Sequence, residues 1–239
     1  MNTNTEEPEF LTCESRITFA MLMFTAGMMG AYTFVMRGGV FCNAQTANFV
    51  LMAVAFGKGD IPGGFYFFIP ATAYFAGAFF SELLPNPVKR HGYLRWDTLL
   101  IGIEAITLFC VGFIPLSVPH QVTQVIINFI ASMQYNTFRQ AEGIPMATTF
   151  CTNHLRQTGV ACAKAFHRKD KTALKRGKVH FTMILCFICG GFILTFACRY
   201  LAEKAIWLAL VPLLIMFIRL LRADLIYEHD YLELKPRGH

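Results

Sequence analysis

The residues of this sequence that could do chemistry are polar side chains, without formal charge, in two short clusters within apolar sequence. Amides, hydroxyls and a neutral imidazole can replace the water around a polar solute without the cost of a buried charge. The same groups form hydrogen bonds between membrane helices, so a packing role stays open for them. The clusters, together with two amides that precede the second one, comprise Asn43, Thr46, Asn48, Gln134, Asn136, Thr152, Asn153 and His154.

Three titratable side chains stand out because they interrupt apolar sequence. Glu104 lies inside the stretch 97–117. It is either a proton or cation coupling site, or an interfacial carboxylate that reaches toward the lipid headgroups. His154 and Arg156 lie in the second cluster. They either hold an anion or shuttle protons, or they form the wet face of an amphipathic helix.

Motifs of known catalytic chemistry are missing from the sequence. It contains no Walker loop, no Rossmann glycine pattern and no nucleophile elbow, and no nucleophile–base pair can be named. Cys186 and Cys189 share a helix face, but no second Cys or His pair completes a zinc set. We therefore expect a protein that is not an enzyme and that has no metal site and no cofactor.

The elements that must position these residues are long apolar segments. The chain has 239 residues, of which 55% are hydrophobic and 15% charged, and its mean hydropathy is +0.46. Soluble domains carry about 25% charged residues, and stretches of ~20 apolar residues are long enough to cross a bilayer. The sequence therefore predicts an all-α integral membrane protein. It excludes a soluble enzyme, a disordered chain and a β-barrel, whose strands alternate in polarity.

Eight segments are apolar enough to be considered as membrane spans, and two of them are unusually polar. Residues 40–57 begin with VFCNAQTANF, and residues 144–163 contain TTFCTNHLRQT. Polar groups at this density normally line a cavity or pack inside protein. The other six segments, which we expect to cross as ordinary helices, are 17–36, 63–84, 97–117, 121–138, 179–199 and 205–222.

The distribution of Lys and Arg favours six crossing helices plus two re-entrant or broken polar helical segments. In that topology 17 of the 21 basic residues face the cytoplasm, whereas eight crossings would leave 14 inside and 7 outside. Residues 1–16 and 223–239 are then cytoplasmic tails of a single transmembrane domain, 17–222, in the cell membrane. The basic loop Lys164–Lys178 has seven Lys or Arg against one Asp. We expect it to contact anionic lipid and not nucleic acid.

A weak internal repeat relates the two polar segments. Thr33-Phe34 matches Thr137-Phe138, and after a two-residue slip Thr46-Ala47-Asn48 falls opposite Thr152-Asn153-His154. Each copy heads one half of the chain. Because each half would make three crossings, an odd number, the two halves would be inverted in the membrane, an arrangement typical of transporters.

At these positions the sequence resembles the YoaK-like family of bacterial multi-pass membrane proteins, which is classed as a domain of unknown function. The family pattern has a Gly-Gly-Val-Phe turn followed by a Thr-Gly-Asn signature, which returns in the second half. The resemblance covers roughly residues 17–222 and implies an architecture but no activity. Ala47 replaces the first signature Gly, Asn153-His154 replaces Gly-Asn, and Gly30 stands where the family often has an acid. The matching stretches are Gly38–Phe41, Thr46–Asn48, Met133–Asn136, Pro145–Thr149 and Thr152–His154.

The leading hypothesis is a small transporter or channel for a polar solute, built from two inverted three-span halves at about 17–117 and 121–222. The polar clusters would bind the solute, and Glu104 would be the coupling site. The alternative is a membrane scaffold or interaction protein that does not transport and that holds a partner or anionic lipid with its basic loop. The expected partners are thus the lipid bilayer and a polar small molecule, and a homo-oligomer is compatible with both hypotheses.

Overall fold

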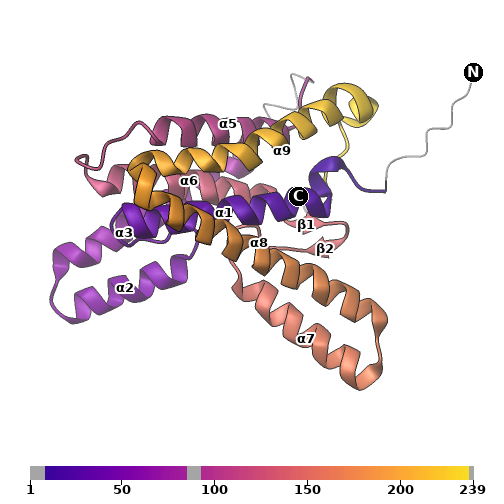
Figure 1. Cartoon of the computed structure of the whole chain (residues 1–239), viewed down its shortest axis with the longest axis horizontal. Helices are drawn as coiled ribbons and strands as arrows, with labels where there is room; N and C mark the ends of the chain where they lie inside the picture. The colour runs from indigo at the N-terminus through magenta and orange to yellow at the C-terminus, as the bar shows by residue number, and fades with distance from the viewer. Residues whose placement is uncertain (1–8, 85–92, 237–239) are drawn as a thin grey trace, which may run out of the picture.

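The computed structural model describes residues 9–84 and 93–236, which form a helical bundle with a short β-hairpin. Figure 1 shows helical hairpins at the lower left (α2 and α3) and at the lower right (α7 and α8). The helices are α1 (Arg16–Met36), α2 (Gln45–Gly57), α3 (Ile61–Leu83), α5 (Trp96–Val111), α6 (His120–Thr137), α7 (Thr152–Arg168), α8 (Lys171–Leu201) and α9 (Leu210–Arg222). Shorter elements are β1 (Gln140–Ala141), β2 (Ile144–Pro145) and the helical turns η1 (Thr12–Glu14), η2 (Ala202–Ala209), η3 (Ala223–Tyr227) and η4 (His229–Tyr231).

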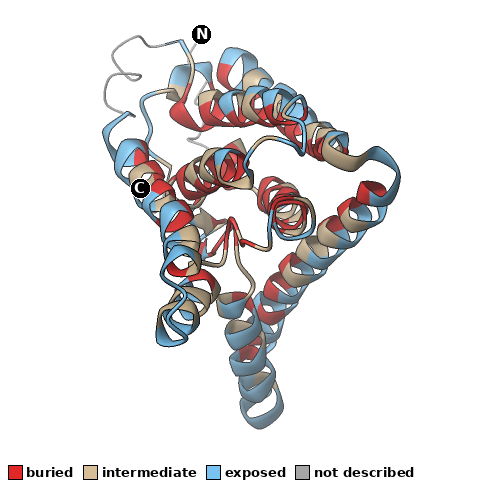
Figure 2. Cartoon of the chain, turned by 90° about the vertical axis from the view of Figure 1, so that its left-hand side faces the viewer, coloured by how far each residue is buried: buried red, intermediate tan, exposed pale blue. Residues whose placement is uncertain are grey.

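Several of these helices are suited to a lipid environment. Within the described residues, the stretches Arg16–Met36, Ile61–Leu83 and Lys171–Tyr227 are long and apolar enough to cross a membrane. Figure 2 shows that buried residues concentrate toward the interior of the bundle, while its outer sides are exposed. Large apolar side chains lie on those outer sides, including Phe75 and Phe192. The prediction of an all-α membrane protein is therefore confirmed.

Each long helix packs against particular partners. α1 packs along α8, and α3 packs along α6. α2 lies against α3, α7 against α8, and α5 against α9, as Figure 1 also shows. In addition, α5 contacts α6 and α9 contacts α1. Helix α1 therefore packs against helices of the second half of the chain, and α6 packs against helices of the first half.

Glycines allow the α1–α8 and α3–α6 pairs to approach closely. A Cβ atom on Gly190 of α8 would lie 2.0 Å from the carbonyl oxygen of Phe24 in α1. One on Gly77 of α3 would lie 2.2 Å from the carbonyl oxygen of Phe129 in α6. Small residues permit such backbone contacts between membrane helices. A side chain at either glycine would push the two helices apart.

Both polar segments, 40–57 and 144–163, are broken into an extended stretch followed by a helix. α1 ends at a turn in which Gly39 has a φ angle of 75°, which glycine adopts without strain, and α2 begins only at Gln45. After α6 the chain forms the β1–β2 hairpin, which the sequence did not indicate, and α7 begins only at Thr152.

The expectation of a basic loop at Lys164–Lys178 is wrong in its secondary structure. These residues end α7 and begin α8, and only Lys169 and Asp170 separate the two helices. Lys169 has a left-handed conformation with a φ of 51°. The Asp170 carboxylate caps α8 by accepting a hydrogen bond from the backbone N–H of Ala173 at 2.9 Å. The cations thus lie on a tight helical hairpin.

The described parts of the two predicted cytoplasmic tails, residues 9–16 and 223–236, pack against the bundle. At the start of α5, Arg95 forms a buried ion pair with Glu228 and lies 3.9 Å from a carboxylate oxygen of Asp224. Glu228 also accepts a hydrogen bond from the backbone N–H of Thr12 at 2.7 Å. We call Arg95, Asp224 and Glu228 the Arg95 cluster. It ties the segment before α1, through Thr12, and the segment after α9 to the start of α5.

The glycine contact between α1 and α8 predicts a sharp difference between two adjacent positions. We expect Gly190→Ala to lower the free energy of unfolding by about 1–3 kcal/mol, because its Cβ would overlap the Phe24 carbonyl and the helices must separate. Gly191→Ala is the matched control: its Cβ would lie 3.4 Å from the nearest atom. That variant should be neutral or slightly stabilising. Thermal unfolding in detergent measures both, and an equal loss from the two variants would contradict the packing.

Candidate functional site

The chain reverses direction after α1 and runs back along that helix. The backbone N–H of Cys42 donates a hydrogen bond to Thr33 Oγ1 at 3.3 Å, and the side-chain amide of Asn43 donates to the carbonyl oxygen of Ala26 at 3.0 Å. Ala26 lies ten residues before Met36, the last residue of α1, which is about 15 Å along a helix. The extended stretch 37–44 therefore carries Asn43 deep into the bundle.

Asn48 fixes this first reversal. From the first turn of α2 its side-chain carbonyl oxygen accepts from the backbone N–H of Phe41 at 3.1 Å, and its amide donates to the Phe41 carbonyl oxygen at 2.7 Å. Both backbone groups of an extended residue are thereby satisfied without water. A polar side chain is needed because an unpaired backbone group in a membrane interior is costly.

His154 makes the corresponding contact in the second half. Its Nε2 lies 2.7 Å from the carbonyl oxygen of Ala147, again seven residues earlier in the chain. Because a carbonyl oxygen can only accept, Nε2 carries the proton, and Nδ1 is free to accept from His180 Nδ1 at 3.0 Å. Both imidazoles are neutral in this arrangement, so His154 acts as a buried structural link between the second reversal and α8.

The second reversal runs back beside the end of α6. The side-chain amide of Gln134 donates to the carbonyl oxygen of Thr148 at 3.4 Å, and the rings of Tyr135 and Phe150 lie 5.0 Å apart. Residues 146–151 thus mirror the path of 37–44, each along the helix that precedes it.

Glu104 is buried among these elements without a partner. It has 0% of its surface exposed, and neither carboxyl oxygen has a hydrogen-bond partner among the described residues. The interpretation as an interfacial carboxylate is therefore wrong. An ionised carboxylate in such a place would lose its hydration without compensation. The site accommodates a protonated acid, or a carboxylate paired with a bound cation.

The first reversal reaches the surroundings of Glu104, and Tyr74 links it to the second reversal. The Cys42 thiol of the first reversal lies close enough to interact electrostatically with Glu104 and with Tyr74 of α3. Tyr74 in turn contacts Thr149 of the second reversal. We call Glu104, Cys42, Tyr74 and Thr149 the central polar group. Two neighbouring oxygens of the second reversal and α6, Oε1 of Gln134 and Oγ1 of Thr148, are also buried without a hydrogen-bond partner.

The expected site residues separate into inner and outer positions. Asn43, Asn48, Gln134 and His154 are buried, and each bonds to the backbone of a reversal or to that of the helix beside it. Thr46 and Thr152, and also Arg156, are exposed, Asn153 is half-buried and bonds to Arg156, and Asn136 lies at the end of α6. The two Thr-x-Asn/His motifs do not face each other, because each folds back on its own half.

Sequence reasoning missed the polar face of α6. Gln124, Asn128 and Ser132 are four residues apart and lie on one face of the helix. Gln124 donates to Tyr66 Oη at 2.6 Å, Ser132 donates to the Tyr74 carbonyl oxygen at 2.5 Å, and Asn128 accepts from the amide of Gln45 at 2.7 Å. The four-residue spacing of polar residues in an apolar segment was the available signal.

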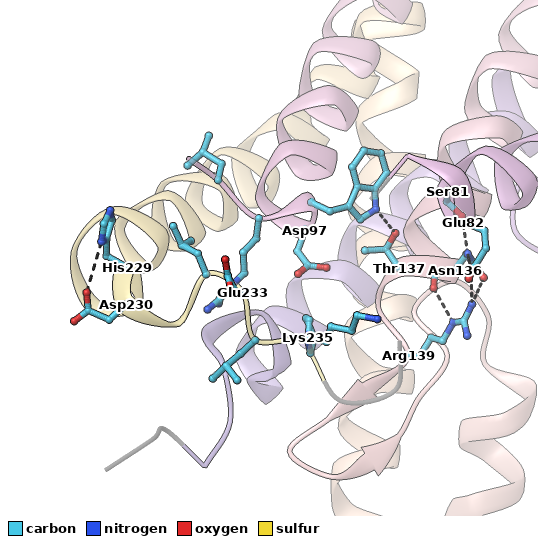
Figure 3. A pocket seen from close by; sticks show the side chains of 16 residues that line it. Ser81, Glu82, Asp97, Asn136, Thr137, Arg139, His229, Asp230, Glu233 and Lys235 are labelled. Atoms are coloured by element: carbon cyan, nitrogen blue, oxygen red, sulfur yellow. Dashed lines mark hydrogen bonds and ion pairs between the residues drawn. The ribbon is translucent and has the colours of Figure 1, made fainter. Parts of the chain in front are cut away.

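A cavity of about 760 Å³ lies at the end of the bundle that holds the Arg95 cluster. Its wall comes from the ends of α3 and α6, the start of α5 and the C-terminal segment 229–236, as Figure 3 shows. Asn136 lies in this wall, where its amide donates to Ser81 Oγ at 2.7 Å and its carbonyl oxygen accepts from Arg139. Glu104 does not line the cavity.

These features define a helical membrane protein with two broken polar segments, the first of which reaches a buried carboxyl group. The chain belongs to the family described as protein of unknown function (DUF1275), which it matches over residues 18–219. It is 21% identical over 211 residues to the UPF0700 transmembrane protein YoaK of Bacillus subtilis (strain 168), a match that covers 86% of this chain and 92% of that protein. No solved structure matches the chain. The resemblance to the YoaK-like family is therefore confirmed.

The role of Asn48 as a link to the Phe41 backbone can be tested with a matched pair of variants. Asn48→Leu removes both hydrogen bonds, and each buried group left unpaired costs about 1–3 kcal/mol. We therefore expect the free energy of unfolding to fall by about 2–4 kcal/mol. Thr46→Val lies in the same helical turn at an exposed position and should change it by less than about 0.5 kcal/mol. The measurement is thermal unfolding in detergent; similar values for both variants would rule out the proposed link.

Proposed function

We propose that the protein is a small transporter or channel for a polar solute, and the buried position of Glu104 is the observation that carries this proposal. Isolated carboxyl groups within membrane helices are rare and typically mark ion or proton pathways. Here the carboxyl group lies close to Cys42 of the first chain reversal, where irregular backbone replaces helix, and Tyr74 links that reversal to the second. Irregular backbone at membrane depth is characteristic of substrate and ion sites in transporters.

The pairing of the helices supports two inverted halves with three crossings each. Suppose that the helices of the first half, α1, α2, α3 and α5, are exchanged in this order with those of the second half, α6, α7, α8 and α9. The α1–α8 pair then becomes the α6–α3 pair, and the α2–α3 pair becomes the α7–α8 pair. The α5–α9 pair is exchanged with itself. The exchange also relates the close approach at Gly190 to that at Gly77, and the seven-residue contact of Asn48 to that of His154. Halves with an odd number of crossings have opposite orientations in the membrane.

In this proposal α2 and α7 do not cross, and each returns to the side from which its segment entered. The positive-inside rule then favours a cytoplasmic position for the end of the bundle that holds both chain ends. The opposite end carries Arg37, Lys58, Arg199 and Lys204. Part of the charge argument, Lys89 and Arg90, lies outside the described residues.

The groups around Glu104 define the chemistry of the central site. The unpaired side-chain oxygen of Gln134 accepts hydrogen bonds, and the hydroxyl of Thr148 accepts or donates them. A solute with N–H or O–H donors would satisfy both, while Glu104 binds a proton or pairs with a cation. A change of charge at Glu104 alters the electrostatic energy of this buried site. In this way the carboxyl group would couple the binding of the solute to its movement across the membrane.

The coupling role of Glu104 predicts a separation of transport from stability. Glu104→Gln keeps the shape of the side chain but removes the titratable group. We expect flux in proteoliposomes to fall at least tenfold, while the unfolding temperature stays equal or rises, because a neutral amide needs no proton to be buried. Glu203→Gln, at the opposite end of the bundle from the Arg95 cluster, is the matched control. Unchanged flux in Glu104→Gln, or no wild-type flux across a panel of ions, amino acids and small organic acids, would contradict the proposal.

The helical hairpin of α7 and α8 favours a second candidate function, a scaffold that binds anionic lipid. This hairpin projects from the bundle in Figure 1. Every Lys and Arg within Lys164–Lys178 is exposed on it. Near an anionic surface each such cation contributes about 1 kcal/mol. The tip could therefore hold lipid headgroups whether or not the central site transports.

Neutralising Lys169, Lys171, Lys175 and Arg176 to Gln tests this second function. The stabilisation of the detergent-purified protein by phosphatidylglycerol, read as the rise in unfolding temperature, should be largely lost because the electrostatic attraction is removed. The control is the change of Lys58 and Lys204, at the opposite end, to Gln. Tight DNA binding at physiological salt, lost in the four-residue variant, would instead assign the hairpin to nucleic acid.

A further inference from the structure

The cavity at the end of the bundle has the size and lining of a small-molecule site. Its volume of about 760 Å³ lies within the ~300–1,000 Å³ typical of such sites. The wall combines polar groups with apolar side chains, among them Leu94, Trp96 and Leu234. Trp96 is 6% exposed and its Nε1 donates to Thr137 Oγ1 at 2.9 Å. Because this bond fixes the indole, the wall is already formed without an occupant.

The charged residues of the wall favour a cationic occupant. Arg95 is neutralised by Glu228, outside the wall, and also donates to the carbonyl oxygen of Tyr231 at 2.7 Å. Arg139 bonds to Asn136 and lies 3.6 Å from the carboxylate of Glu82. The remaining basic residue of the wall, Lys235, is exposed. The acidic residues of the wall are Glu82, Asp97, Asp230 and Glu233.

Two of these carboxylates come from facing elements. Asp97 reaches the cavity from the start of α5, and Glu233 reaches it from the C-terminal segment, as Figure 3 shows. Asp97 is 3% exposed and receives a hydrogen bond from the Cys13 thiol. Carboxylates that line one cavity repel each other, and a cation between them replaces repulsion by attraction.

The cavity is also aligned with Glu104. Asp97 and Glu104 are seven residues apart on α5, so they lie on the same face of the helix, about 10 Å apart along its axis. Leu100 and Ile101 lie between them and are 0% exposed. An apolar layer one turn thick thus separates the cavity from the central polar group.

We propose that this cavity is a binding vestibule for a small organic cation, an ammonium group with a short apolar body, held by Asp97 and Glu233 against the indole of Trp96. The ammonium group pairs with the carboxylates, and the apolar body contacts Trp96 and the leucines of the wall. The binding itself does not depend on transport. Only the passage of the cation from the vestibule to Glu104 rests on the proposed function.

Tryptophan fluorescence can report on this vestibule specifically. The chain contains two tryptophans, and Trp207 is stacked on Phe109, remote from the wall. In a Trp207→Phe background the emission comes from Trp96 alone. We expect butylammonium and 1,4-diaminobutane to change this emission saturably, whereas butyrate and butanol, which match the chain length without the positive charge, do not.

Variants of the two carboxylates locate the binding. Asp97→Asn should weaken butylammonium at least tenfold, and Glu233→Gln, at an exposed residue that the fold does not need, should weaken it several-fold. Glu203→Gln, a matched change at the other end of the bundle, should leave the affinity unchanged. The Glu233 variant keeps the test valid if Asp97→Asn does not fold.

Two results would overturn the proposal of a vestibule. One is an equal response to butylammonium and butyrate, and the other is an affinity for butylammonium that neither carboxylate variant changes. Saturable butylammonium binding that depends on the carboxylates, in a protein that shows no flux, would support the vestibule while it overturns the proposed function. The two failures are therefore distinguishable.

Discussion

The structure depends on two side chains, each of which is hydrogen-bonded to the backbone of the residue seven positions earlier in the chain. Asn48 bonds to both backbone groups of Phe41, and His154 bonds to the carbonyl oxygen of Ala147. The N–H and C=O groups of extended backbone do not bond to one another as those of a helix do, and within a membrane there is no water to bond to them. These contacts therefore permit the chain to turn back inside the bundle. Without them, Cys42 could not reach Glu104, and Thr149 could not reach Tyr74.

The same requirement explains why α6 is polar although it lies inside the bundle. Its amide and hydroxyl groups bond to α2, α3 and the backbone of the second reversal. Paired in this way, buried polar groups select one arrangement of helices, because any shift would leave several of them unsatisfied. Glu104 differs from these residues because both of its carboxyl oxygens are buried without a hydrogen-bond partner among the described residues. Groups that are buried and unsatisfied destabilise a fold, and their presence at one point is the physical reason for placing a ligand or a proton there.

The two halves differ most where they meet the aqueous phase. α2 packs against α3 without a cluster of charges, whereas its counterpart α7 forms a basic hairpin with α8. At the same end of the molecule the Arg95 cluster joins α5 to both chain ends and closes one side of the cavity. Pairing within this cluster matters because each charge is buried, and a single unpaired member would cost several kcal/mol. In the proposed repeat α9 corresponds to α5, and α9 has no charged residue between Leu210 and Ile218 that would match Glu104.

The sequence by itself determined the membrane class, the positions of the two broken segments and the correspondence of Asn48 with His154. These features follow from composition, from apolar length and from local spacing, which act over a few turns of chain. It also identified Glu104, but it left open whether this residue reaches the headgroups or lies in the interior. Only the tertiary structure decided that Glu104 is buried, that Thr46 and Thr152 face outward, that the basic stretch is helical and that Thr12 and Glu228 pack together at the start of α5. The reason is that such outcomes depend on partners distant in sequence: Gln45 meets Asn128 across 83 residues, and Arg95 meets Glu228 across 133. Local patterns place a residue on a face of its own helix, but only the packing of helices decides what that face meets.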